Sequence, residues 1–137
     1  MILCDENVNY QFLEKIASKL SDKDIELIFT DDYKMKEINQ AQRNINKSTD
    51  VLSFPLQEIQ GLNLLGSVVI NLDLAQKKAK ELGHSLEDEI SLLFIHGALH
   101  LMGFDHETDN GQMRTKESEL IKLFNLPKSL IVRAGES

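Results

Sequence analysis

The stretch 96-HGALHLMGFDH-106 constrains the fold of this chain more than any other, because it places three of the four histidines within eleven residues. On a helix, residues four apart point within about 40° of each other and lie about 6 Å apart along the axis, so His96 and His100 can bind one ion. If the helix continued, His106 would be turned about 240° from His100 and displaced by about 9 Å. The helix must therefore end between them, and Gly103 can end it because glycine takes positive φ at low cost.

Three converging imidazoles predict a metal site with one ion per chain, because the ligand spacing and the glycine at the break occur together. Imidazole nitrogen suits zinc, which is the ion we expect, and also accepts nickel, copper or cobalt. Three protein ligands leave the fourth coordination position of zinc open for water, which is typical of catalytic rather than structural sites. The remaining histidine, His84, has no such partners along the sequence, and we expect it at the surface.

The ligand spacing is similar to that of the metzincin zinc peptidases, H-E-x-x-H-x-x-G-x-x-H, with one difference. Position 97 holds glycine where a peptidase carries the glutamate that acts as general base. The missing glutamate disfavours peptide hydrolysis, because the poor amine leaving group must be protonated. It matters less for an alkoxide leaving group, which a metal or an arginine can stabilise. We expect Gly97 to leave room for backbone or substrate close to the metal.

Length and composition predict a single domain over residues 1–137. The 137 residues, 42% of them hydrophobic, are enough for one core and too few for two. The N-terminal residues show no basic segment followed by an apolar run, and no stretch reaches the roughly eighteen apolar residues of a membrane span. We therefore expect a soluble protein without a membrane partner. A single cysteine, Cys4, fits a reducing cytoplasm and a buried strand.

The net charge of −7 argues against a protein that binds nucleic acid through bulk electrostatics, because that affinity comes largely from counterions displaced by Lys and Arg. A nucleic-acid substrate would need a local basic face. Two clusters of basic residues are candidates for it: Lys34, Lys36, Arg43 and Lys47 in one region, and Lys77, Lys78 and Lys80 in another. The alternative is that both clusters are solvated helix faces, as most charge runs are.

Hydrophobic periodicity predicts a mixture of helices and short strands. The expected helices cover residues 10–20, 32–42, 72–82, 86–101 and 110–124, and the expected strands cover residues 24–30, 50–55 and 64–70. Asp31 or Asp32 can cap the second helix, and Gly83 can end the third. Ser85 and Asp88 resemble a capping box for the fourth. The fold class is therefore α+β, with one small mixed four-stranded sheet, about five helices and a buried central helix that carries the histidines of a zincin-like site.

The block 96–107, taken with 48-STDVLSFP-55 and Arg43, closely resembles the YbeY family of bacterial rRNA maturation factors, whose signature runs H-G-x-L-H-L-x-G-Y/F-D-H. The resemblance extends from about Asp31 to Leu123. It implies a zinc-dependent, single-strand-specific endoribonuclease that acts in 16S rRNA 3′ end maturation and late ribosome quality control. The implied partners are single-stranded RNA, in particular small-subunit rRNA, and the ribosome or its associated proteins.

Carried over residue by residue, the resemblance makes His96, His100 and His106 the zinc ligands. Arg43, in 38-INQAQR-43, matches the arginine that lies near the metal in the family. A guanidinium offers two donors to one phosphate, so Arg43 is our candidate catalytic residue, with a phosphate oxygen as its partner. Such a contact would compensate locally for the acidic surface.

Asp105 and Asp50 also match positions of the family motifs, and each has a structural and a functional interpretation. Asp105 can orient a ligand histidine, while Asp50 can begin a strand or cap a turn. The family commonly has L-G-D-I/V where this chain has 65-LGSVVI-70, so Ser67 stands in place of an aspartate. If that position is structural, the serine hydroxyl can supply a backbone hydrogen bond. If it handles substrate or metal, this chain lacks that group.

Two other classes of function compete with the nuclease. The first is a non-catalytic ribosome-assembly factor whose metal only stabilises the fold. The second is a metallohydrolase of another substrate class, such as a peptidase, which the histidine spacing suggests and Gly97 opposes.

Overall fold

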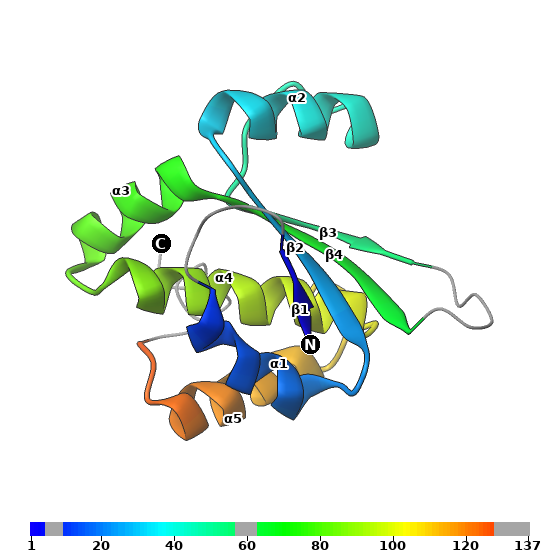
Figure 1. The fold of residues 1–137 in the computed structure, drawn as a ribbon, viewed down its shortest axis with the longest axis vertical. Helices are drawn as coiled ribbons and strands as arrows, with labels where there is room; N and C mark the ends of the chain where they lie inside the picture. Colours follow the sequence, from blue (N-terminus) through cyan, green and yellow to red (C-terminus); the bar gives the residue numbers. More distant parts are fainter. Residues whose placement is uncertain (5–9, 57–62, 128–137) are drawn as a thin grey trace.

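The structure, a computed structural model, describes residues 1–4, 10–56 and 63–127 (Figure 1). The helices in chain order are η1 (Gln11–Leu13), α1 (Glu14–Leu20), α2 (Asp32–Arg43), α3 (Leu72–Leu82), α4 (Leu86–Leu101) and α5 (Gln112–Phe124). The strands are β1 (Ile2–Leu3), β2 (Asp24–Thr30), β3 (Val51–Pro55) and β4 (Leu64–Asn71). Among these described residues, no helix combines the length and apolarity needed to cross a bilayer.

The four strands form one mixed sheet in the order β1-β2-β4-β3. β1 pairs in parallel with β2, and β2 pairs in parallel with β4. β3 runs antiparallel to β4, with Ser53 opposite Val68, and forms one edge of the sheet. The expected α+β class and the expected neighbours β3 and β4 are therefore confirmed.

The sheet separates two layers of helices, with α2 on one face and α1, α4 and α5 on the other (Figure 1). Because side chains alternate along a strand, neighbouring residues of β4 serve opposite faces. Val68 belongs to the large core with α4, whereas Val69 packs with Met35 of α2 and Leu52 of β3. The central strand is consequently buried on both faces, as its apolar run suggests.

The helix boundaries follow the predicted capping residues. The Asp31 side chain accepts a hydrogen bond from the Lys34 backbone N–H at 2.7 Å, and Ser85 accepts one from Asp88 N–H at 3.0 Å. Gly83 ends α3 with a φ of 73°. α4 is buried along almost its whole length, so the predicted central helix is confirmed.

Two details of the N-terminal third differ from expectation. The helix expected over residues 10–20 begins as the single 3-10 turn η1 before α1. Cys4 follows the two-residue strand β1 and is half-buried against the core, so its expected place within a buried strand is wrong.

Gly97 allows α4 to lie close against the sheet. A Cβ atom at this position would lie 2.9 Å from Val68 Cγ1, 3.1 Å from Ser53 Oγ and 3.2 Å from Val51 Cγ2. The Ser53 hydroxyl donates a hydrogen bond of 2.8 Å to the Gly97 carbonyl oxygen. The space that glycine leaves is therefore filled by side chains of β3 and β4, and position 97 faces the sheet.

Substituting Gly97→Glu should destabilise the protein by about 3 kcal/mol, because it forces a charged side chain into a contact with no room for a methyl group. The free energy of unfolding can be measured by urea denaturation. Gln76→Glu, which introduces the same carboxylate at an exposed position of α3, is the control and should change stability by less than about 0.5 kcal/mol. Equal stability of the two variants would contradict the close contact of α4 with the sheet.

Candidate metal centre

The three motif histidines converge as predicted. His96 and His100 lie on successive turns of α4, with their Nε2 atoms 3.3 Å apart. His106 comes from the segment after the helix, and one ring nitrogen from each histidine lies within 4.8 Å of the other two. Each of the three residues is partly buried, which leaves the cluster accessible at the surface of the protein.

The chain reversal that returns His106 to the helix occurs at Gly103. α4 ends at Leu101, and Gly103 adopts a φ of 97°, in the left-handed region that favours glycine. Its N–H donates a hydrogen bond of 3.0 Å to the His100 carbonyl oxygen, and Phe104 N–H donates one of 3.1 Å to the carbonyl of Leu99. These bonds satisfy carbonyls at the end of the helix and turn the chain back.

The orientation of His100 is fixed by the same turn. Its Nδ1 lies 3.0 Å from the Phe104 carbonyl oxygen, which can only accept a hydrogen bond. In the neutral ring Nδ1 therefore holds the hydrogen, and Nε2 presents its lone pair to His96. This arrangement, in which the outer nitrogen bonds to a carbonyl and the inner one faces the centre, is typical of metal-binding histidines.

The nitrogens of His96 and His100 are spaced like two ligands of a tetrahedral zinc ion, within a set of three that lie within 4.8 Å of one another. In tetrahedral coordination with Zn–N bonds of about 2.0–2.1 Å, two ligand nitrogens lie about 3.3–3.4 Å apart. The Nε2 atoms of His96 and His100 are 3.3 Å apart. At this distance either a proton on one of the two nitrogens or a cation bound to both prevents repulsion between their lone pairs. The cluster can therefore hold a divalent ion on three imidazole nitrogens.

Burial lowers the pKa of His100 from its ordinary value of 6.5. The neighbouring His96 lowers the pKa further when it is charged, while the hydrogen bond to Phe104 acts in the opposite direction. Both the burial and the neighbouring imidazoles favour the neutral ring. The neutral ring is the form that binds a metal.

Arg43 is the last residue of α2 and is exposed. It extends from the helix that covers the sheet face opposite α4 (Figure 1). Within the part of the chain that the structure describes, its guanidinium makes no hydrogen bond or ion pair. Its predicted role beside the metal stays a prediction.

Asp105 and Ser67 make local contacts. Asp105 Oδ1 accepts a hydrogen bond of 3.1 Å from Glu107 N–H, within the loop that carries His106. Ser67 lies on β4 next to Val68, so its side chain emerges on the sheet face away from α4. The Ser67 hydroxyl bonds to the carboxylate of Glu26 on β2, so the partner is a side chain and not the backbone.

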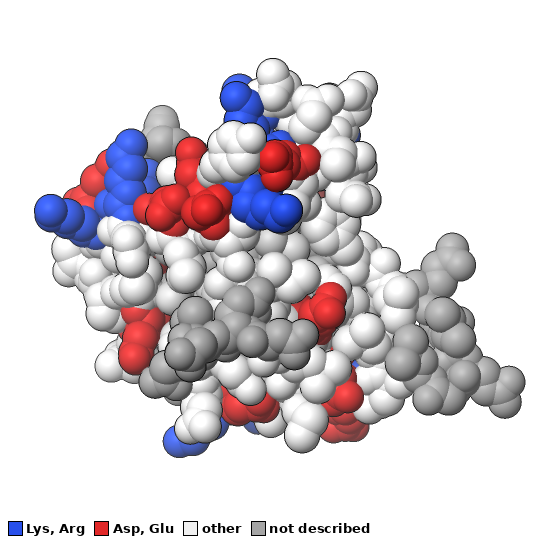
Figure 2. All heavy atoms as spheres, turned by 45° about the horizontal axis from the view of Figure 1, so that its top comes forward, with Lys and Arg blue, Asp and Glu red and all other residues white. Residues whose placement is uncertain are grey.

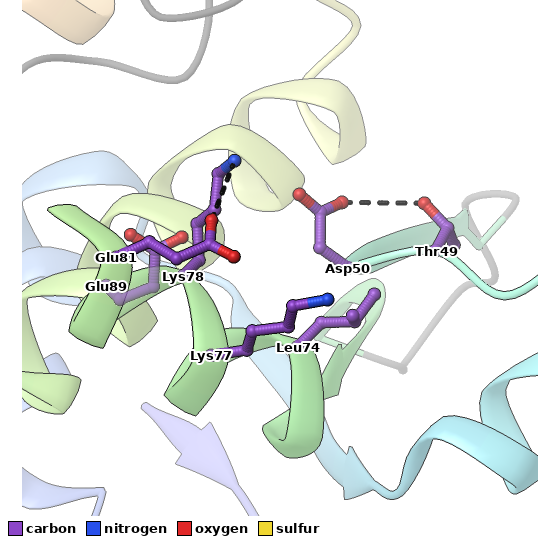
Figure 3. Close-up of a pocket in the computed structure, with 7 residues that line it drawn as sticks. All are labelled: Thr49, Asp50, Leu74, Lys77, Lys78, Glu81 and Glu89. Atoms are coloured by element: carbon purple, nitrogen blue, oxygen red, sulfur yellow. Dashed lines mark hydrogen bonds and ion pairs between the residues drawn. The ribbon is translucent and has the colours of Figure 1, made fainter.

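Asp50 lies in a different hollow, between the start of β3 and the helices α3 and α4 (Figure 3). The residues that line this hollow are Thr49, Asp50, Leu74, Lys77, Lys78, Glu81 and Glu89. Glu89 precedes His96 by about two helical turns, so this hollow and the histidine cluster lie at different places along α4. The Asp50 backbone carbonyl accepts a hydrogen bond of 2.9 Å from Asn71 N–H, which agrees with a structural role at the start of the strand.

His84 is partly buried and paired, and is not the solvent-exposed residue that was predicted. Its side chain is only 12% exposed, and its Nε2 lies 2.8 Å from Oε1 of Glu89, which is buried. A buried carboxylate is costly without a partner, and the imidazole supplies one. The pair is five residues apart and joins the turn after α3 to the first half of α4.

The two predicted basic clusters lie on or next to α2 and α3, where basic and acidic side chains alternate (Figure 2). Lys34 lies 3.7 Å from Glu37, and Lys78 lies 3.7 Å from Glu81. These exposed pairs reduce the local positive charge. The clusters therefore resemble solvated helix faces more than one continuous basic surface.

Glu117 of α5 is a buried residue beside the cluster that lies outside the histidine motif. Its carboxylate is 1% exposed, and Oε2 lies 3.5 Å from Nδ1 of His96. A signal was present in the sequence, because Glu117 occupies the same helical stripe as the buried Met113 and Leu120. A charged residue in an apolar stripe indicates a buried partner.

In the metal-free protein, His100 should titrate below pH 6.5. Between this lowered pKa and pH 6.5 the unfolded chain binds a proton that the folded protein does not, so the free energy of unfolding should rise with pH. The stability that depends on neutral His100 is fully present above pH 6.5 and is lost as the pH falls through the lowered pKa. NMR titration of the imidazole nitrogens and urea denaturation from pH 5 to 8 test this. An unchanged pH dependence in His100→Gln would contradict it.

Comparison with known proteins identifies the family. Residues 5–125 match the model of the family described as Endoribonuclease YbeY. The chain is 67% identical over 136 residues to the Endoribonuclease YbeY of Campylobacter jejuni strain RM1221, covering 99% of both chains. It is 58% identical to the protein of the same name from Nautilia profundicola, covering 97% of this chain and 98% of the relative. The solution structure of TM1509 from Thermotoga maritima matches with a TM-score of 0.63 and 29% identity, covering 90% of this chain and 89% of that chain. The chain therefore belongs to the endoribonuclease YbeY family.

Proposed function

We propose that this protein is a zinc-dependent endoribonuclease that cleaves single-stranded RNA at the cluster of His96, His100 and His106. The observation that carries the proposal is the convergence of three imidazole nitrogens within 4.8 Å at the partly exposed end of α4. The names of the relatives, which are endoribonucleases, supply the substrate class.

The protein's own residues prepare the site for this chemistry. The lowered pKa of His100 keeps its ring neutral, and the Phe104 carbonyl holds that ring with Nε2 turned inward. A divalent ion bound there supplies Lewis-acid chemistry, which polarises a phosphodiester and activates water. Gly97 has no side chain that could act as a general base, and its position faces the sheet. The site thus suits a leaving group that can depart as an alkoxide.

Arg43 is the proposed phosphate-binding residue. Its exposed guanidinium has no partner among the described residues, so its donors are available to RNA. A planar guanidinium can donate two hydrogen bonds to one phosphate. Such a contact matters in a protein with a net charge of −7, whose overall field repels RNA.

The biological role we propose is maturation of the 3′ end of 16S rRNA and late ribosome quality control in the cytoplasm, with the ribosome or its associated proteins as partners. Family membership supports this role. Purified precursor small-subunit particles, incubated with the zinc-loaded protein, should gain mature 3′ ends.

The purified protein should bind one zinc ion per chain, and His96→Ala, His100→Ala and His106→Ala should each reduce occupancy sharply, because two imidazoles bind zinc far more weakly than three. Metal analysis after gel filtration measures this. His84→Gln, which keeps a donor for Glu89, should retain full occupancy.

The same zinc-loaded preparation should cleave single-stranded RNA and leave peptide and ester substrates intact. Peptide hydrolysis would favour the metallohydrolase alternative. Absence of RNA cleavage, together with unfolding on zinc removal, would favour a metal-stabilised assembly factor.

Arg43→Glu should lower the rate of RNA cleavage by at least about tenfold at low salt, since attraction to phosphate becomes repulsion. Arg43→Lys should be intermediate, because the charge remains but the two-donor fork is lost. Zinc content and stability should stay near those of the wild type.

The control for the charge change is Lys15→Glu, at an exposed position of α1. Cleavage rates should be compared at matched zinc occupancy and several salt concentrations. If Arg43→Glu and Lys15→Glu reduce the rate equally, bulk charge and not a specific phosphate contact explains the effect.

A further inference from the structure

Glu117 is a buried carboxylate that the proposed mechanism does not use. It lies on α5 with its side chain 1% exposed, between the buried residues Met113 and Leu120. Its Oε2 has no hydrogen-bond partner in the described part of the chain. Burying a carboxylate without a compensating partner costs several kcal/mol. The position therefore needs a physical explanation.

The nearest candidate partner is the outer nitrogen of His96. His96 Nδ1 lies 3.5 Å from Glu117 Oε2, while Nε2 of the same ring is turned toward His100. His96 Nδ1 is also buried and without a hydrogen bond among the described residues. The two unsatisfied atoms thus face each other, at a separation slightly longer than an ordinary N–H···O hydrogen bond.

We infer that Glu117 is a positioning residue of the metal centre, which accepts the Nδ1–H of His96 and so turns the Nε2 lone pair toward the ion. This inference rests on the proposed metal site. Its geometry parallels that of His100, whose Nδ1 lies 3.0 Å from the Phe104 carbonyl. Two of the three ligand rings are then oriented by groups behind them, one from the loop after α4 and one from α5.

A carboxylate behind His96 does more than a neutral carbonyl would do. It makes the ring a stronger electron-pair donor, and it places a negative charge close to an ion that three neutral ligands leave with its full double charge. The buried carboxylate is in turn stabilised by that ion. α5 therefore contributes to metal binding although it provides none of the three motif histidines.

The test compares Glu117→Gln and Glu117→Met with the control Glu119→Gln, which makes the same chemical change at an exposed position two residues further along α5. Zinc affinity is measured by competition with a chelator. The His96 tautomer is read from imidazole nitrogen shifts of the zinc-loaded protein. Thermal unfolding of the metal-free forms reports the stability of the fold.

Glu117→Gln should raise the zinc dissociation constant by about 10- to 100-fold, because the amide oxygen still accepts the hydrogen bond but the charge is lost. Glu117→Met should raise it further, and its His96 should lose the single Nδ1–H tautomer. Metal-free Glu117→Gln should unfold at or above the wild-type temperature, since a buried charge has been removed. Glu119→Gln should match the wild type in every measurement.

Wild-type zinc affinity in both Glu117 variants would overturn the inference while leaving the metal site in place. Absence of zinc binding in the wild type would overturn the proposed function and this inference together. If Glu117→Met fails to fold, the isosteric Glu117→Gln still decides the question.

Discussion

The close contact between α4 and the sheet at Gly97 is the constraint on which the rest of this structure depends. A side chain at this position would meet Val68, Ser53 and Val51, so only glycine lets the helix lie this near the strands. The Ser53 hydroxyl then fixes the helix along its axis through its bond to the Gly97 carbonyl. Because His96 precedes this glycine directly, the depth and the rotation of α4 set where the first ligand points.

The positions of the other two ligands, His100 and His106, depend on how the helix ends. Gly103 reverses the chain, and the same turn brings the Phe104 carbonyl to the back of His100. One local structure therefore orients His100 and returns His106 to the cluster. The third support comes from a different part of the chain, where α5 places Glu117 behind His96. A site of three residues is held by the sheet, by a turn and by a packed helix.

Much of this arrangement could be predicted from the sequence, because it is local. Helical spacing places His96 beside His100, and the need for His106 to return makes a break at Gly103 necessary. The contacts of Glu117 and His84 could not be predicted in the same way, because the spacing of residues along one helix does not show which side chain of another segment lies against it. In each pair, His84–Glu89 and His96–Glu117, a histidine lies beside a buried glutamate. The pairing depends on how the helices pack in three dimensions. The apolar stripe around Glu117 was the available signal.

The locality of the ligand set also has a consequence for chain entropy. The first and last histidines are ten residues apart, so bringing them together closes a short loop. Such a closure costs on the order of 2 kcal/mol plus a constant, which is about 1 kcal/mol less than closing a loop of forty residues. The parallel pairing of β2 with β4, in contrast, joins segments about forty residues apart. Bringing the histidines together therefore closes a short loop, whereas pairing β2 with β4 closes a long one. Because short loops close at a lower entropy cost, the turn of the metal-binding segment can form before the long-range strand pairs are complete.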